Sequence, residues 1–388
     1  MVERGNTGEY LSSVAGGEKV HAFVPAPLPP EPPLRFTPER RRLLERATLA
    51  LGRLDSITLL LPDPEIFLYS YVRREAVLSS QIEGTQSSLS DLLQFELSEA
   101  PGVPFDDVVE VSNYVLALEH GLSCLADGLP LCNRLLREMH EVLLSRGRGS
   151  GKRPGEFRRS QNWIGGTRPG NAFFVPPPPQ VVESCMDGLE RFIHDSEQPY
   201  PTLVKAALAH VQFETIHPFL DGNGRLGRLL ISFMLHDEGM LSRPLLYLSL
   251  YFKTHRQAYY ERLNQVRTRG EWEEWIDFFL EGVEQTALDA VETARRLVTL
   301  MRRDEQRIHG LGRRAGSALR VHRTLCHRPL QSIKEMASEL ELSYPAVSKS
   351  LLALAELDVV HEITGRQRNR IYAYQTFIDV LNEGAQPP

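Results

Sequence analysis

A helical spacing of apolar residues, sustained from about residue 37 to residue 310, restricts the fold of this chain more than any other feature. Segments such as "TLVKAALAHVQFETI" and "WEEWIDFFLEGVEQTALDAVETARRLVTLMRR" repeat apolar residues at helical intervals. A single stretch, residues 145 to 180, interrupts the period with glycines and prolines, and its "NAFFVPP" is typical of a strand edge that prolines end. We therefore expect a mainly α fold with one irregular flap that contains a small β-hairpin.

The two ends of the chain differ from this helical region. Residues 1 to 36 are rich in glycine and serine and then in proline, as in "VPAPLPPEPPLRF", which predicts an extended arm over the surface. Thr37 and Pro38 then begin the first helix, as its N-cap and first helical residue. Residues 317 to 388 contain a helix, a turn, a second helix and two short alternating runs, which predicts an α+β winged helix-turn-helix.

Composition excludes several broad classes of protein. The net charge is −6, so the chain as a whole makes no electrostatic case for binding nucleic acid. The four cysteines are scattered without a CxxC pair, which argues against a disulfide framework or a zinc site and fits a reducing compartment. The first residues have no apolar core of signal-peptide length, and no later segment holds about twenty consecutive apolar residues. We expect a cytoplasmic protein without a membrane partner.

The segment "HPFLDGNGRLGR", residues 217 to 228, carries the strongest chemical signal. Pro218 ends the preceding helix after His217, and "DGNG" lies just before the next helix. Backbone N–H groups at a helix N-terminus favour a bound anion. Arg225 and Arg228 are three residues apart and share a helix face, so two guanidiniums lie beside this turn. The combination indicates a polyphosphate ligand.

The acid and the histidine of this segment have chemical roles that suit a polyphosphate. Asp221 offers the carboxylate that a phosphate-bound Mg²⁺ takes from a protein, and His217 can act as a general base. Each residue also has a structural alternative: a hydrogen-bonded histidine, a turn aspartate and arginines on a solvated helix face. A rival metal site of His210, Glu214 and His217 has helical spacing, but it leaves the glycines and arginines unexplained.

The segment matches HPFx(D/E)GNGRxxR, the core motif of the Fic domain, at every fixed position, and the chain resembles the Fic family over about residues 37 to 300. This resemblance implies a Fic-type helical domain and Mg²⁺-dependent transfer of AMP from ATP to a Ser, Thr or Tyr hydroxyl of a target protein or of the enzyme itself. The chain then divides into an arm (1–36), an N-terminal helical region with an inhibitory helix (37–110), a catalytic core with a linker helix (111–310) and a winged helix (317–388).

The resemblance also implies residue roles. His217 would deprotonate the target hydroxyl, which attacks the α-phosphorus, and Asp221 would hold Mg²⁺ across the α- and β-phosphates. Arg225 would contact the β-phosphate and Arg228 the γ-phosphate. The whole nucleotide-binding set of the loop is Gly222, Asn223, Gly224, Arg225, Leu226, Gly227 and Arg228.

Residues around the loop complete the implied site. Phe219 would point into the core and anchor the loop, and the flap near residues 173 to 176 would align the target segment by strand-like pairing. Tyr259 or Tyr260 is a candidate to flank the adenine, with a place in the aromatic core as the alternative for both.

A second motif precedes the loop in the sequence. In "SSQIEG", Ser79 and Glu83 are one helical turn apart, and Gly84 has the position of a glycine that ends a helix. A glutamate at a helix C-terminus is unfavourable by about 0.3–1 kcal/mol. The segment matches the inhibitory motif (S/T)xxxE(G/N) of one class of Fic proteins. The resemblance implies that Glu83 pairs with Arg228 in place of the γ-phosphate, or that it positions water for removal of AMP.

The tail suggests a function of another class, a DNA-binding regulator. Arg366, Arg368 and Arg370 in the wing could follow phosphates, but residues 317 to 388 hold eight basic and eight acidic residues. Winged helices also dock proteins, so DNA and a protein remain alternative partners of this tail. The sequence leaves open whether the chain is a monomer or a homodimer.

Overall fold

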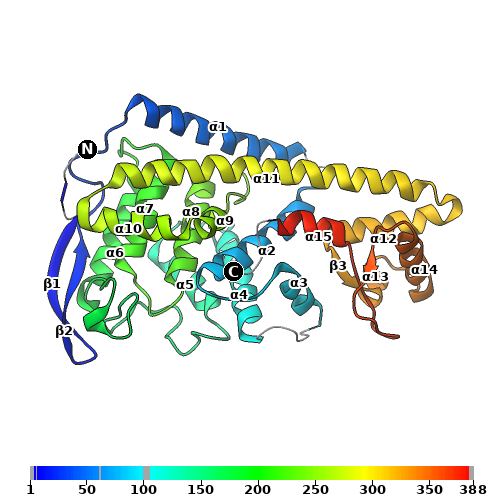
Figure 1. Ribbon diagram of the computed structural model, residues 1–388, viewed down its shortest axis with the longest axis horizontal. Helices are drawn as coiled ribbons and strands as arrows, with labels where there is room; N and C mark the ends of the chain where they lie inside the picture. Colours follow the sequence, from blue (N-terminus) through cyan, green and yellow to red (C-terminus); the bar gives the residue numbers. More distant parts are fainter. Residues whose placement is uncertain (1–3, 6, 61–62, 99–104, 384–388) are drawn as a thin grey trace. The chain divides into compact units, whose positions relative to one another are not determined.

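The structure, a computed structural model, describes residues 4–5, 7–60, 63–98 and 105–383, and it is mainly helical (Figure 1). The described residues form fifteen α-helices, a two-stranded sheet and a three-stranded sheet. This architecture confirms the expected mainly α fold with small β elements. Among the described residues, no helix is both long and apolar enough to cross a membrane.

The chain divides into two compact units that are discontinuous in sequence. The first unit contains Met1–Gly52 and Asn113–Ala287, and the second contains Arg53–Ser112 and Leu288–Pro388. Three helices contribute residues to both units: α1 (Pro38–Leu60), α4 (Phe105–Ala126) and α11 (Trp272–His309). The N-terminal helical region and the C-terminal tail, which are far apart in the sequence, therefore belong largely to one unit.

The core of the first unit is built around α7 (Thr202–Ile216), from which every residue after Thr202 is buried. A helix that is buried on all sides needs small or apolar residues around its whole circumference, and "LVKAALAHVQF" mostly supplies them. The helices α6 (Pro179–His194) and α8 (Asn223–Asp237) pack against it. The remaining helices that lie wholly in this unit are α5 (Asn133–Leu143), α9 (Ser249–Thr254) and α10 (Arg256–Arg269).

A β-hairpin lies where the sequence predicted an extended arm, so that prediction is wrong for residues 8 to 25. Strand β1 (Gly8–Ala15) pairs antiparallel with β2 (Glu18–Pro25). The two residues between them, Gly16 and Gly17, have φ of 55° and 83°, and a two-residue hairpin turn with positive φ at both positions favours glycine. The proline-rich residues that follow connect this hairpin to α1 without helix or strand.

The second unit contains α2 (Pro64–Ile82), α3 (Leu89–Ser98) and the C-terminal elements. These elements are α12 (Ala315–His327), β3 (Leu330–Ser332), α13 (Ile333–Glu339), α14 (Tyr344–Glu356), β4 (His361–Glu362), β5 (Ile371–Ala373) and α15 (Gln375–Asn382). The antiparallel sheet has the order β3-β5-β4. The side chain of Ser332 caps α13, and that of Ser343 caps α14. The winged-helix assignment of this segment stays a prediction.

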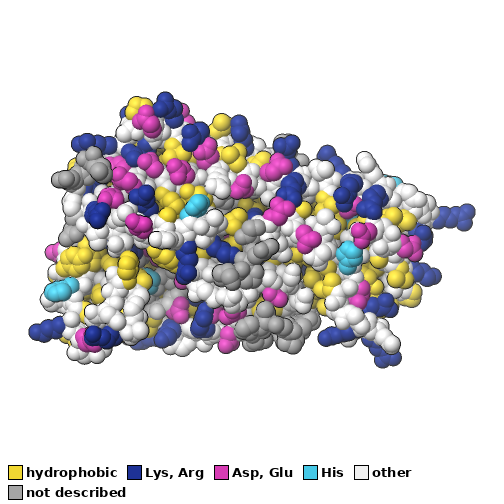
Figure 2. All heavy atoms as spheres, viewed as in Figure 1, with side chains coloured by type: hydrophobic (Ala, Val, Ile, Leu, Met, Phe, Trp, Pro, Cys, Tyr) yellow, Lys and Arg dark blue, Asp and Glu magenta, His cyan; other side chains and the backbone are white. Residues whose placement is uncertain are grey.

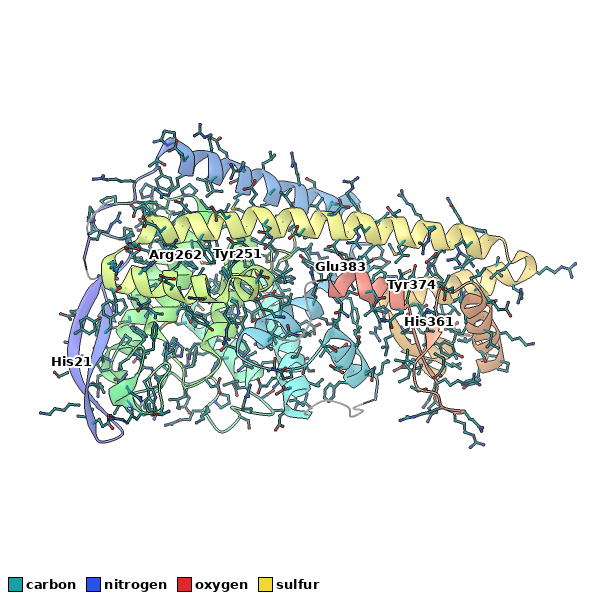
Figure 3. All side chains as sticks on the ribbon, in the orientation of Figure 1. His21, Tyr251, Arg262, His361, Tyr374 and Glu383 are labelled. Atoms are coloured by element: carbon teal, nitrogen blue, oxygen red, sulfur yellow. The ribbon has the colours of Figure 1, made fainter. Side chains whose placement is uncertain are left out.

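A buried carboxylate attaches the C-terminal helix to α11 within the second unit. Asp304 of α11 accepts a hydrogen bond of 2.7 Å from the hydroxyl of Tyr374, which precedes α15 (Figure 3). Burial opposes the ionisation of Asp304, but hydrogen bonds from Arg303, Tyr374 and Arg307 outweigh it and lower the pKa. At the other end of α15, Glu383 pairs with Arg296 of α11. The helix is therefore held at both ends.

Candidate functional site

The nucleotide loop predicted from the sequence joins α7 to α8 in the first unit. Helix α7 ends at Ile216, and His217 has left-handed backbone angles, φ 50° and ψ 61°. Such angles are unusual for a residue other than glycine, and they occur often at functional sites. Helix α8 begins at Asn223, two residues earlier than the sequence suggested, so the "DGNG" turn overlaps its first turn. The prediction that this turn lies at a helix N-terminus is confirmed.

Arg158, which no local sequence pattern indicates as a site residue, holds the backbone at His217. Its Nε donates to the carbonyl of His217 at 2.9 Å, and its guanidinium also donates to the carbonyls of Ile216 and Pro177. The side chain is almost fully buried, and this burial lowers its pKa to about 10. These bonds satisfy carbonyl groups at the C-terminus of α7 and explain how the strained conformation of His217 is maintained.

The loop is closed by the side chain of Asn223. Its amide accepts from the N–H of Phe219 and donates to the carbonyl of the same residue, both at 2.9 Å. Phe219 is fully buried and stacks on His140 with 3.7 Å between the ring centroids. The prediction that Phe219 anchors the loop in the core is confirmed. The Asn223 side chain therefore spans the loop, and its contact with a nucleotide stays a prediction.

His140 of α5 is a second supporting residue that the sequence analysis missed. Its Nδ1 accepts from the N–H of Gly155, so its Nε2 carries the proton and donates to the carbonyl of Asp221 at 3.0 Å. Burial lowers the pKa of His140 to about 4, which keeps the ring neutral and preserves this hydrogen-bond pattern. The sequence signal was weak, because a histidine in an apolar helical pattern is an ordinary core residue.

The three charged residues of the loop differ in exposure. Asp221 is half-buried, and its Oδ1 accepts from the N–H of Gly222 at 2.6 Å and lies 3.4 Å from Arg225. Its Oδ2 makes no hydrogen bond within the described residues, and a Cβ added to Gly149 would lie 3.1 Å from it. One carboxylate oxygen is thus available to a cation, which fits Mg²⁺. Arg225 and Arg228 are both buried, with 3% exposure.

Leu226 and Gly227, two further members of the predicted nucleotide-binding set, also serve packing, and their contact with a nucleotide stays a prediction. Leu226 is fully buried, so its side chain belongs to the core. A Cβ on Gly227 would lie 2.6 Å from Oε1 of Glu214 and 3.1 Å from the ring of Phe213, so α8 approaches the side chains of α7 closely at this glycine. Gly222 differs, because its φ of 75° is left-handed and favours glycine for the loop itself.

Tyr259 is a core residue, which is the alternative that the sequence analysis left open. It is 1% exposed, and its hydroxyl donates to Nε2 of His210 at 2.8 Å. The other ring nitrogen of His210 donates to the carbonyl of Gly227 at 2.9 Å, so neither nitrogen is available to a metal. The rival metal site is therefore excluded. Tyr260 is 38% exposed and remains the candidate for the adenine contact.

Among the described residues, the flap contains a single antiparallel bridge and no regular strand, where the sequence predicted a small β-hairpin. Ile164 pairs with Phe174, and the N–H of Ile164 donates to the carbonyl of Phe174 at 2.8 Å. Two aromatic side chains of the flap are exposed, Trp163 at 38% and Phe173 at 65%. Phe174 faces inward, where the guanidinium of Arg267 lies 4.0 Å from its ring centroid. The flap is thus anchored through the inward-facing Phe174, and its other aromatic side chains form an exposed apolar surface.

Family comparisons agree with this geometry. The sequence pattern of the Fic/DOC family matches residues 130–235, which include the whole loop, the flap, α5 and α7. The pattern of the Fic/DOC family N-terminal region matches residues 41–123. Residues 41–123 and 130–235 belong to the Fic/DOC family.

Curated relatives carry the same family name. The Protein adenylyltransferase Fic of Culex quinquefasciatus is 32% identical over 224 residues, which cover 55% of this chain and 40% of that protein. The Protein adenylyltransferase Fic of Aedes aegypti is 36% identical over 133 residues, which cover 34% of this chain and 24% of that protein. The matched region is therefore less than half of the length of these relatives.

Solved structures show the same fold at low sequence identity. A Fic family protein from Desulfovibrio desulfuricans has a TM-score of 0.57 at 20% identity, over 88% of this chain and 98% of that one. Fic-1 (residues 134–508) from C. elegans has a TM-score of 0.51 at 19% identity, over 66% of this chain and 73% of that one. The mainly helical Fic fold is therefore shared.

The motif that resembles the Fic inhibitory segment lies in the second unit. Helix α2 ends at Ile82, Glu83 is its C-cap, and Gly84 has a φ of 99°, so the predicted helix end is confirmed. Ser79 is fully buried, whereas Glu83 is exposed. The role of these residues in inhibition stays a prediction.

Proposed function

We propose that this Fic protein transfers AMP from ATP to a hydroxyl group of a protein target. The observation that carries the proposal is the intact loop: His217 is held in a left-handed conformation six residues before the N-terminus of α8, and the first turns of this helix bear two buried arginines. A helix N-terminus favours a bound anion. The curated relatives, which are named as adenylyltransferases, support the same activity.

The reaction assigns a role to each end of the loop. His217 accepts the proton of a Ser, Thr or Tyr hydroxyl as its oxygen bonds to the α-phosphorus, and the bond from that phosphorus to the β-phosphate oxygen breaks. Pyrophosphate leaves with the negative charge that the arginines and the first turn of α8 stabilise. His217 suits the base role because its imidazole is half-buried, unlike the fully buried His140 and His210.

Phosphate binding would involve the backbone N–H groups of the loop together with its arginine side chains. The N–H of Leu226 makes the first helical hydrogen bond, to the carbonyl of Gly222, so the amides of Asn223, Gly224 and Arg225 precede the helical ladder. These amides and the guanidiniums of Arg225 and Arg228 would bind the β- and γ-phosphates. Asp221 would hold a Mg²⁺ ion, whose charge offsets that of the α- and β-phosphates.

The flap would position the target. An extended target segment can pair with the flap edge, while the exposed rings of Trp163 and Phe173 supply apolar contact. This arrangement would bring a target hydroxyl to His217, because Arg158 links the flap base at Pro177 to the carbonyl of His217. The identity of the target depends on the shape of this surface.

Glu83 would restrain the reaction. By pairing with Arg228 it would occupy the place of the γ-phosphate and leave ATP with a poorly oriented α-phosphate. Support comes from the complete inhibitory motif and from the position of Glu83 at the end of α2, with an exposed side chain. The same carboxylate could orient water for removal of AMP, so addition and removal of AMP are both included in the proposal.

The decisive test is self-modification with ATP labelled on the α-phosphate. We expect His217→Ala to lower labelling about 10²–10⁴-fold while ATP still binds, because the base contributes to the chemical step and the phosphates are held elsewhere. His236→Ala, a change to another histidine of the first unit, is the matched control. Labelling above a tenth of the wild-type rate in His217→Ala would contradict the role of His217.

A second candidate function concerns the C-terminal elements. Arg366 and Arg368 are exposed in the turn between β4 and β5, where they could contact the phosphates of duplex DNA. Figure 2 shows acidic and basic side chains interspersed over the face in view, which does not favour a strong nucleic acid surface. Salt-dependent binding of duplex DNA by the full chain, lost in Arg366→Ala/Arg368→Ala, would support this function.

A further inference from the structure

Three side chains with metal-binding atoms converge between α4 and α5 of the first unit, apart from the residues of the nucleotide loop. His120 and Cys124 are one turn apart on α4, and Glu138 projects from α5. Nε2 of His120 lies 3.6 Å from Sγ of Cys124 and 3.5 Å from Oε2 of Glu138, and Sγ lies 4.0 Å from the same oxygen. The cluster therefore contains one imidazole, one thiol and one carboxylate in mutual contact.

These separations are close to those that a zinc ion imposes. Zinc bonds of about 2.0 Å to nitrogen or oxygen and about 2.3 Å to sulfur, at tetrahedral angles, place the ligand atoms about 3.3–3.6 Å apart. The observed distances of 3.5, 3.6 and 4.0 Å need adjustments of only a few tenths of an ångström. Imidazole, thiolate and carboxylate are also the ligand types that zinc prefers. Both geometry and chemistry fit this ion.

The surroundings of the cluster orient its carboxylate and leave room for an ion to enter. Nε of Arg134 donates to Oε1 of Glu138 at 2.8 Å, which turns Oε2 toward His120 and Cys124. The side chains of His120 and Glu138 are about a third exposed, at 37% and 31%. Such support of a ligand by an outer hydrogen bond is typical of metal sites.

We propose that His120, Cys124 and Glu138 bind a Zn²⁺ ion, with water as the fourth ligand. Zinc binding requires a thiolate, so the Cys124 thiol loses its proton to solvent as the bond from zinc to sulfur forms. The thiolate and the carboxylate together balance the charge of the ion. The bound ion would join α4 to α5, the helix that also carries His140 beneath the nucleotide loop. The proposal does not depend on the adenylyltransferase activity.

The experiment uses the full chain, stripped of metal with a chelator and titrated with Zn²⁺ alone against a chromophoric competitor. We expect one zinc ion per chain, with affinity reduced at least about tenfold in both Cys124→Ser and His120→Ala. Cys185→Ser, which changes another partly buried cysteine of the first unit, is the matched control and should bind as the wild type does. Glu138→Gln should weaken binding without removing the side chain.

Cobalt provides a direct readout of the sulfur ligand. The wild-type chain loaded with Co²⁺ should show a sulfur-to-cobalt charge-transfer band, and Cys124→Ser should lack it while Cys185→Ser retains it. Thermal unfolding of each metal-free variant separates loss of a ligand from loss of the fold. The proposal is overturned if the wild type binds no zinc stoichiometrically, if its cobalt form lacks the band, or if a folded Cys124→Ser variant binds zinc as tightly as the wild type.

Discussion

Three histidines of the first unit differ in chemistry because their surroundings differ. His140 and His210 are fully buried, and burial lowers their pKa values to about 4 and about 3. Each uses both ring nitrogens in hydrogen bonds that require the neutral ring. His217 is half-buried at the end of α7, so it alone of the three has access to a substrate. The residue type alone therefore does not show whether a histidine can act as a general base or only supports the structure.

The buried histidines predict a loss of stability in mild acid. Their folded-state pKa values lie below the ordinary value of about 6.5, so between about pH 6.5 and pH 4 the unfolded chain binds more protons than the folded chain. Lowering the pH from 7 to 5 should then cost about 2 kcal/mol of unfolding free energy for each histidine. Urea unfolding at both pH values measures the difference, and His210→Gln should reduce it. An equal pH effect in wild type and variant would contradict this account.

The carboxylate of the loop gives a separate prediction for the cation. Asp221→Asn should raise the Mg²⁺ concentration needed for half-maximal labelling about tenfold or more, because the amide cannot supply the charged oxygen that Mg²⁺ prefers. The amide keeps the size of the side chain, so the loop should remain folded. The measurement is a Mg²⁺ titration of self-modification beside the control Asp237→Asn at the other end of α8. An unchanged titration in Asp221→Asn would remove Asp221 from the metal site.

At the scale of elements, the N-terminal hairpin supports the flap. The N–H of Phe23 in β2 donates to the carbonyl of Val175 at 2.9 Å. Glu18, at the start of β2, pairs with Arg168 at 2.8 Å and accepts from the N–H of Gly170 at 2.8 Å. The flap has only one antiparallel bridge among its described residues, and even a complete two-stranded hairpin is marginally stable by itself in water. Contact with a hairpin from the far end of the unit's sequence supplies the stability that it lacks.

Removing the Glu18 carboxylate should loosen the flap. We expect Glu18→Ala to increase amide hydrogen exchange in residues 164 to 174 by about three- to tenfold, which corresponds to a modest hydrogen-bond contribution of about 1 kcal/mol. Mass spectrometry of peptides from the flap measures the effect. Glu9→Ala, on the exposed side of β1, is the matched control. Equal exchange in the two variants would show that the hairpin does not restrain the flap.

At the scale of the whole molecule, the proposed catalytic and inhibitory parts belong to different units. The loop lies in the first unit, and the end of α2 lies in the second. Under the proposed inhibition, the second unit would regulate the activity of the first. A partner that binds the second unit would then be able to change the rate of AMP transfer.

Removing the inhibitory carboxylate should raise activity, which few substitutions in a nucleotide site do. We expect Glu83→Gly to increase self-modification about 10–100-fold, since Arg228 regains a charge-assisted hydrogen bond of about 1.5–3 kcal/mol to the γ-phosphate. The double variant Glu83→Gly/Arg228→Ala should lose this gain, because both changes act through one contact. Labelled ATP and the single variants measure the effect. If Glu83→Gly labels no faster than the wild type, Glu83 is not inhibitory.

The local sequence by itself determined where helices end and which residues of the loop can adopt a left-handed turn. Pro218 ends α7, Gly222 permits a left-handed turn and Gly84 ends α2, because these effects depend on a residue's own backbone and its nearest neighbours. The two glycines between β1 and β2 carried an equally local signal for the N-terminal hairpin, but the prolines that follow drew the prediction toward an extended arm.

Only the tertiary structure decided which residues support the loop. His140, Arg158 and Tyr259 have partners that lie 81, 59 and 49 residues away in the sequence. Cys124 and Glu138 are likewise separated by 14 positions in the sequence, and their side chains meet only because the two helices that carry them pack together. A local pattern specifies which groups are present, but burial, hydrogen-bond partners and pKa values arise from long-range packing, and these properties separate a base from a core residue.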